Sequence, residues 1–165
     1  MDFAADNGVG WRQQIQRDLA DLGIVWLDPT NKPTDQAVED NDTKRLLADA
    51  KSVGNYDYIV HQVKVIRNID LRLVDIADFL IVHLDTNIYS FGTIEEIANA
   101  NREKKPIIVH VEQGKAGTPS WLFGMIGHKD IFSTWDELKQ RVRTVATDPS
   151  FNDLCRWHFF NLHHD

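Results

Sequence analysis

The sequence predicts an α/β protein, a three-layer sandwich of helices around a mostly parallel sheet. Residues 78–84 (DFLIVHL) and 106–111 (PIIVHV) are continuous apolar runs rich in β-branched residues, which is typical of strands covered on both faces. A segment with helical spacing of its apolar residues lies between them, and strands alternating with helices indicate a parallel sheet. With 42% hydrophobic residues, residues 1–165 are expected to form a single domain with a full core.

The spacing of apolar residues predicts the first half of the chain. Residues 11–23 predict a helix that ends at Gly23, a typical C-cap residue. The run IVWL at 24–27 predicts a short strand, closed by the loop DPTNKP. Residues 34–50 are polar, and we expect them to be mostly helical. Residues 56–66 fit either a strand or a helix, and the spacing of their apolar residues favours the helix.

Shorter elements complete the pattern. A short helix is expected to begin at Asp70 and to lead into the strand at 78–84. Residues 130–134 (DIFST) predict a last strand, and residues 134–145 (TWDELKQRVRTV) predict a helix with a capping box at its start.

Composition limits the classes of partner and the compartment. The 18 basic and 25 acidic residues give a net charge of −7, which argues against a nucleic-acid partner but leaves room for one small anionic ligand. The single cysteine, Cys155, excludes an internal disulfide framework and suits a reducing environment. No apolar run approaches the roughly 18 residues of a membrane span, and the first residues lack a signal-peptide pattern. We therefore expect a cytoplasmic protein with no membrane partner.

The fold class indicates where a ligand would bind. In open parallel sheets, ligands bind beyond the carboxyl ends of the strands, where the following helices begin. Ser90, Thr93 and the first turn of the next helix follow the strand at 78–84. A helix beginning at Asp70 would run antiparallel to that strand, so its first residue would lie at the same edge. The sequence therefore predicts that Asp70 and Glu96 form a carboxylate pair.

Helix capping is the alternative explanation for both acidic residues. The sequence TIEE at 93–96 fits a capping box with Thr93 as N-cap and Glu96 bonding back to it. Asp70 could likewise be the N-cap of its own short helix. Local pattern alone favours capping for Glu96, and TWDE at 134–137 has the same form without any sign of chemistry.

The spacing of Asp70, Asp78 and SFGTIEE at 90–96, followed by KKPIIV, resembles the nucleoside 2-deoxyribosyltransferase-like family. The similarity runs from about residue 11 to about 138. It implies a flavodoxin-like (Rossmann-like) three-layer fold that forms a homodimer or higher homo-oligomer and uses no cofactor and no metal. Members of this family exchange nucleoside bases or cleave the N-glycosidic bond of nucleoside 5′-monophosphates.

The resemblance also implies roles for individual residues. Glu96 would be the nucleophile that forms a glycosyl-enzyme ester, and Asp70 would lie near the leaving base as its acid. Glu95 would point elsewhere. A serine at position 90, where base-exchange members carry an aspartate, favours a 5′-monophosphate substrate. The predicted substrate-binding residues are Ser90, Gly92, Thr93, Asp78, Arg12 and Trp121.

Two features leave alternatives open. Family members usually begin with an apolar strand that ends in a Gly-Pro turn, and no such run precedes Trp11. A catalytically silent nucleotide-binding or sensor protein is therefore the alternative to an enzyme. Residues 154–162 (LCRWHFFNL) form an apolar run expected to cover a sheet edge or contact a partner subunit. His83 and His110 lie within predicted strands, where core packing is a more common role than metal binding.

Overall fold

A computed structural model describes residues 8–32, 37 and 39–148. Its centre is a parallel sheet of three strands in the order β1-β2-β3, formed by Leu80–Leu84, Ile107–Val111 and Ile131–Phe132. β1 and β2 pair along their whole length, with His83 opposite His110. The predicted α/β class and the parallel strands are confirmed, although the sheet is small.

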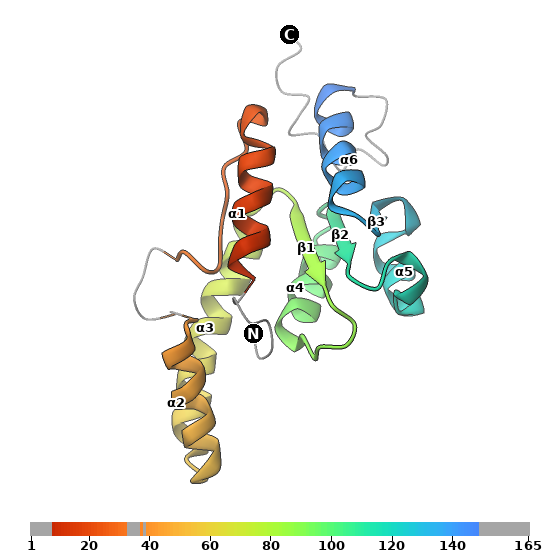
Figure 1. Ribbon diagram of the computed structural model, residues 1–165. Coiled ribbons are helices and arrows are strands. Elements are labelled where there is room, and N and C mark those ends of the chain that lie inside the picture. The colour runs from red at the N-terminus through yellow and green to blue at the C-terminus, as the bar shows by residue number, and fades with distance from the viewer. Residues whose placement is uncertain (1–7, 33–36, 38, 149–165) are drawn as a thin grey trace.

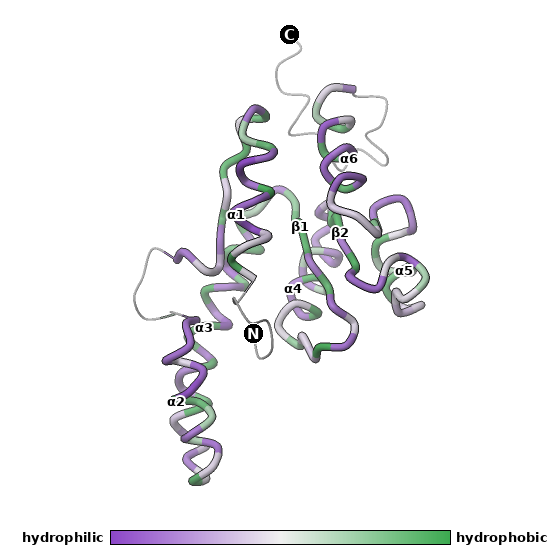
Figure 2. The backbone as a smooth tube through the Cα atoms, in the orientation of Figure 1, coloured by the Kyte–Doolittle hydropathy of each residue, from purple (hydrophilic) through white to green (hydrophobic). Residues whose placement is uncertain are grey.

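Helices cover both faces of this sheet (Figure 1). One core cluster joins side chains of α3, α4 and α5 to Val82 and Val109, and the other joins α1 and α6 to Ile108. All five residues of β2 are buried, as expected for a strand between two helical layers. Figure 2 shows the hydrophobic residues of β1 and β2 at the centre. The described helices are α1 (Val9–Asp18), α2 (Asn41–Ser52), α3 (Tyr56–Ile76), α4 (Phe91–Arg102), α5 (Ser120–Ile126) and α6 (Trp135–Thr147).

The α2 helix and the first half of α3 project away from the sheet as a helical hairpin (Figure 1). Asp40 caps α2 by accepting a hydrogen bond from the Thr43 backbone at 2.7 Å. Leu46 and Val60 remain 49% exposed on this projection. No helix in the described part of the chain is long and apolar enough to cross a membrane. The cytoplasmic location and the homo-oligomeric state stay predictions.

The strand predicted at residues 24–27 is not formed, which corrects the sequence analysis. The segment contains no hydrogen-bonded strand. Ile24 and Trp26 pack beneath α1 and α6, whereas Val25 is 84% exposed. A strand requires a neighbour for its backbone groups, and the nearest edge of the sheet, β1, lies across a cavity lined by both segments. β-branched composition alone therefore did not produce a strand here.

The helix expected to begin at Asp70 is also wrong, because Asp70 lies inside α3. This helix is continuous over 21 residues and begins after Asn55, whose side chain accepts a hydrogen bond from the Tyr58 backbone at 3.4 Å. The segment contains no glycine or proline that would interrupt it. The helix favoured for residues 56–66 is thus confirmed, and capping is excluded as the role of Asp70.

The capping box predicted at residues 93–96 is wrong for a similar reason. The α4 helix begins at Phe91, with Ser90 in the N-cap position and without a side-chain cap. Glu96 is therefore the sixth residue of the helix, too far along to reach the N-cap. In α6, by contrast, the hydroxyl of Thr134 accepts a hydrogen bond from the Glu137 backbone at 3.3 Å, as predicted. The apolar run at 154–162 lies outside the described residues.

Candidate functional site

A cavity of about 830 Å³ lies between α1, residues 23–29, the end of α3 and β1. Its walls are largely apolar and include the side chains of Ile24 and Ile81. Charged and polar side chains are also present. They are Arg12, Gln16, Asp21, Asp28, Asp70, Asp78 and Glu96. The cavity therefore brings together the two predicted catalytic carboxyl groups.

Glu96 projects from α4 into this cavity and is partly buried. Burial, and to a smaller extent the negative charge of Asp70, raise the pKa of its carboxyl group to about 7, while the positive charge of Arg12 opposes this change. Burial outweighs any effect of the helix N-terminus, because Glu96 is the sixth helical residue. Glu96 thus exchanges its proton near neutral pH.

Glu95, the adjacent glutamate, lies in a different environment. Its carboxylate accepts two hydrogen bonds from the guanidinium group of Arg67 on α3, one of them 2.7 Å long from Nε. Arg67 lowers the pKa of Glu95. Glu95 therefore forms a surface ion pair, and Glu96 is the glutamate that belongs to the cavity.

Asp70 shares an ionic cluster with Lys32 and Glu39. The Lys32 ammonium group lies 2.7 Å from Oδ1 of Asp70 and 2.5 Å from Oε1 of Glu39, and its side chain is 2% exposed. Burial raises the pKa of Asp70 to about 6, and Lys32 opposes that change. Lys32 and Glu39 carry no recognisable signal in the sequence, because they belong to a polar segment without a motif.

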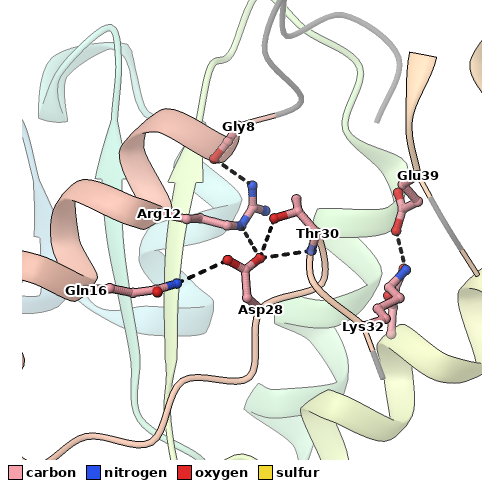
Figure 3. A network of polar contacts seen from close by, with 8 residues as sticks. Gly8, Arg12, Gln16, Asp28, Thr30, Lys32 and Glu39 are labelled. Carbon is pink, nitrogen blue, oxygen red and sulfur yellow. Dashed lines mark hydrogen bonds and ion pairs between the residues drawn. The ribbon is translucent and has the colours of Figure 1, made fainter. Parts of the chain in front are cut away.

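Arg12 is held at the cavity wall by a network around Asp28 (Figure 3). Asp28 accepts hydrogen bonds from Gln16 at 3.1 Å and from the Thr30 backbone at 2.8 Å. The Arg12 side chain lies 3.9 Å from Asp28 and donates a hydrogen bond to the Gly8 carbonyl at 3.0 Å. A positive charge is thus fixed close enough to Glu96 to lower the pKa of its carboxyl group.

The remaining predicted residues divide into two groups. Asp78 lines the cavity, as do Arg12, Asp70 and Glu96. Ser90, Gly92 and Thr93 lie at the beginning of α4, outside the cavity lining. Trp121 on α5 is 83% exposed and also lies outside it. The structure therefore brings together the charged part of the predicted site and leaves the start of α4 and Trp121 outside.

No protein-family model, no curated protein and no solved structure matches this chain. The resemblance described above therefore depends on the residues between Asp70 and Glu96, and membership of that family stays a prediction.

Proposed function

We propose that this protein cleaves the N-glycosidic bond of a nucleoside or deoxynucleoside 5′-monophosphate, or of a deoxynucleoside, on a flavodoxin-like three-layer fold. The observation that supports this most is the pair formed by Asp70 and Glu96. The two carboxyl groups line one cavity, and both have pKa values raised toward neutrality, to about 6 and about 7. Perturbed carboxyl groups in a cavity are typical of catalytic acids and nucleophiles.

The chemistry requires one ionised and one protonated carboxyl group. The Glu96 carboxylate attacks the anomeric carbon and forms an ester, while the electrons of the broken C–N bond go to the base. Asp70 donates its proton to a nitrogen of the departing base. Water then attacks the ester, Asp70 takes a proton from that water, and Glu96 leaves as a carboxylate. A second base in place of water gives base exchange through the same intermediate.

The protonation of the pair suits this sequence near neutral pH. Between about pH 6 and pH 7 the pair carries mainly one proton, since the two pKa values lie at those positions. Attack by Glu96 requires that proton to be on Asp70, whose raised pKa allows it to hold one. Lys32 fixes the position of the Asp70 carboxyl group through their 2.7 Å ion pair.

A 5′-phosphate has a suitable location at the beginning of α4. Ser90 precedes Glu96 by six residues, about 9 Å along a helix axis. The unpaired N–H groups and dipole of a helix N-terminus favour an anion, and a serine hydroxyl can donate to phosphate without repelling it. We propose this position for the phosphate of a substrate whose sugar lies over Glu96.

The second candidate function is a catalytically silent nucleotide-binding or sensor protein. The observation that favours it is the position of Ser90, Gly92 and Thr93, which lie outside the cavity that contains the carboxyl pair. A phosphate could then bind at the start of α4 without placing the glycosidic bond over Glu96.

One experiment separates these functions. The protein is incubated with deoxynucleosides and with their 5′-monophosphates, and free base is measured with and without an acceptor base. Glu96→Gln should abolish base release, whereas the matched control Glu95→Gln should retain it. Full activity in a folded Glu96→Gln protein would refute the mechanism. Binding without base release in the wild type would establish the sensor instead.

A further inference from the structure

We propose that His83, His110 and Glu112 form a binding site for a divalent transition-metal ion such as Zn²⁺. This site lies on the sheet beneath α1 and α6 and is independent of the proposed glycosidase function. His83 and His110 are direct partners on β1 and β2, so their side chains share one face of the sheet. Their Nδ1 atoms are 2.9 Å apart.

Glu112 supplies the third ligand. It follows His110 by two residues, which places both side chains on the same face. Its backbone N–H donates to the Leu84 carbonyl at 2.9 Å, so its position beside β1 is fixed. One ligand atom from each of the three residues lies within 4.8 Å of the others. Oε2 of Glu112 is 3.9 Å from Nε2 of His83, so the carboxylate lies beside that ring and turns toward Nδ1 to complete the ligand set. The Glu112 side chain is 57% exposed and has room to close on an ion.

The distances fit a tetrahedral zinc ion after a small adjustment. Two imidazole nitrogens bound to zinc at 2.0–2.1 Å are about 3.3 Å apart in a tetrahedral site. The two Nδ1 atoms therefore need to separate by less than half an ångström as the ion replaces the proton they share. Two imidazoles and one carboxylate suit zinc and related transition metals, whereas Mg²⁺ and Ca²⁺ prefer oxygen ligands.

The surroundings hold the two histidines in place. The indole ring of Trp135 stacks on His110 with a centroid distance of 4.3 Å and lies 5.5 Å from the His83 ring. Packing against Trp135 therefore fixes the orientation of both imidazole rings, with Nδ1 of His110 turned toward Nδ1 of His83.

Occupancy of this site would also affect the cavity. Trp11 lines the cavity, and its ring centroid lies 5.9 Å from that of His83. Three protein ligands leave a fourth position open on the exposed side of Glu112, where water or an external ligand could bind.

The principal alternative is a neutral His–His hydrogen bond that only fills the space beneath Trp135, and this alternative requires no contribution from Glu112.

Equilibrium dialysis of the full chain with Zn²⁺ tests the site, and the visible absorption spectrum of bound Co²⁺ reports its coordination. We expect one Zn²⁺ per chain. Replacement of an orienting partner typically weakens metal binding by about 10- to 100-fold, and removal of a direct ligand should do at least as much. Zn²⁺ affinity should therefore fall by at least about tenfold in His83→Gln and in Glu112→Gln.

The matched controls use histidines outside the cluster. His128→Gln alters an exposed histidine, and the triple variant His158→Gln, His163→Gln and His164→Gln removes histidines outside the described residues. Both should bind Zn²⁺ as the wild type does. The proposal is overturned if the wild type binds no Zn²⁺, if folded His83→Gln and Glu112→Gln bind it normally, or if only the triple variant loses it. His83 is partly exposed, so its replacement should leave the fold intact.

Discussion

Replacing Glu96 with glutamine should make the protein more stable above neutral pH while removing its activity. In the folded protein the pKa of Glu96 is raised from 4.5 to about 7, mainly by burial. Between these two pH values the folded state binds more protons at this carboxyl group than the unfolded state does. The free energy of unfolding therefore falls as pH rises through that window. Glutamine at position 96 carries a neutral amide at every pH, so the free energy of unfolding of the variant does not fall in this way.

The size of the effect follows from the change in pKa. A tenfold change in proton affinity corresponds to about 1.4 kcal/mol, so a carboxyl group raised from 4.5 to about 7 contributes about 3 kcal/mol. Glu96→Gln should match the wild type in stability near pH 4, where both side chains are neutral. At pH 8 the variant should be more stable than the wild type by about 3 kcal/mol.

Urea unfolding at pH 4 and pH 8, followed by circular dichroism, measures this difference. Glu95→Gln is the matched control, because it removes only an exposed ion pair with Arg67, and exposed ion pairs contribute little to stability. If the difference in free energy of unfolding between Glu96→Gln and wild type is the same at both pH values, the Glu96 carboxyl group is not held in a poorly solvated site.

Four further predictions concern the same site and the fold. The pH profile of kcat/KM should be bell-shaped with a maximum between about pH 6 and pH 7, because the one-proton form of the Asp70 and Glu96 pair is most abundant there; a profile that is flat from pH 5 to pH 8 would contradict it. Asp70→Asn should slow base release from natural substrates far more than from one with an activated leaving group, and equal losses would indicate a positioning role. Ser90→Asp should reverse or erase a preference for 5′-monophosphates over nucleosides, measured as the ratio of kcat/KM values. Thr134→Ala should lower the free energy of unfolding by about 1 kcal/mol, because the α6 cap is lost; an unchanged urea midpoint would show that the cap contributes nothing.

Features that depend on nearby residues were predictable from the sequence. Helices cover both sides of the sheet, so β1 and β2 need apolar side chains on both faces. The continuous apolar runs in the sequence show this directly. The helix predicted to end at Gly23 ends as an α-helix at Asp18, and a short 3-10 turn at Ala20–Leu22 follows it. Gly23 closes that turn with a φ of 67°, a left-handed conformation that glycine adopts without strain. The Thr134 cap is likewise a contact between residues three positions apart.

Features that depend on distant contacts were not predictable. The Lys32 ammonium group is buried between two negative charges, Glu39 nearby in sequence and Asp70, which lies 38 positions further along the chain. The sequence also placed Asp70 near Glu96 for an incorrect reason, since Asp70 lies inside α3 and not at a helix start. Asp70 and Glu96 face one cavity because α3 packs against α4. On the exposed side of this helix pair, Arg67 of α3 and Glu95 of α4 form an ion pair.

The outer edge of β1, beside which no other strand of the described residues lies, explains both the failed strand prediction and the raised pKa of Glu96. The hydrogen bonds from Leu80 to the Pro106 carbonyl and from Glu112 to the Leu84 carbonyl direct the backbone of those β1 residues toward β2. Because direction alternates along a strand, the backbone N–H and C=O groups of Ile81 point to the opposite side, where the cavity lies. Within the described residues no strand extends the sheet there, so residues 24–27 have no pairing partner. The resulting space is bounded by apolar side chains, and a carboxylate at its margin is poorly solvated. The raised pKa of Glu96 is thus a consequence of the same sheet edge that leaves the 24–27 segment unpaired.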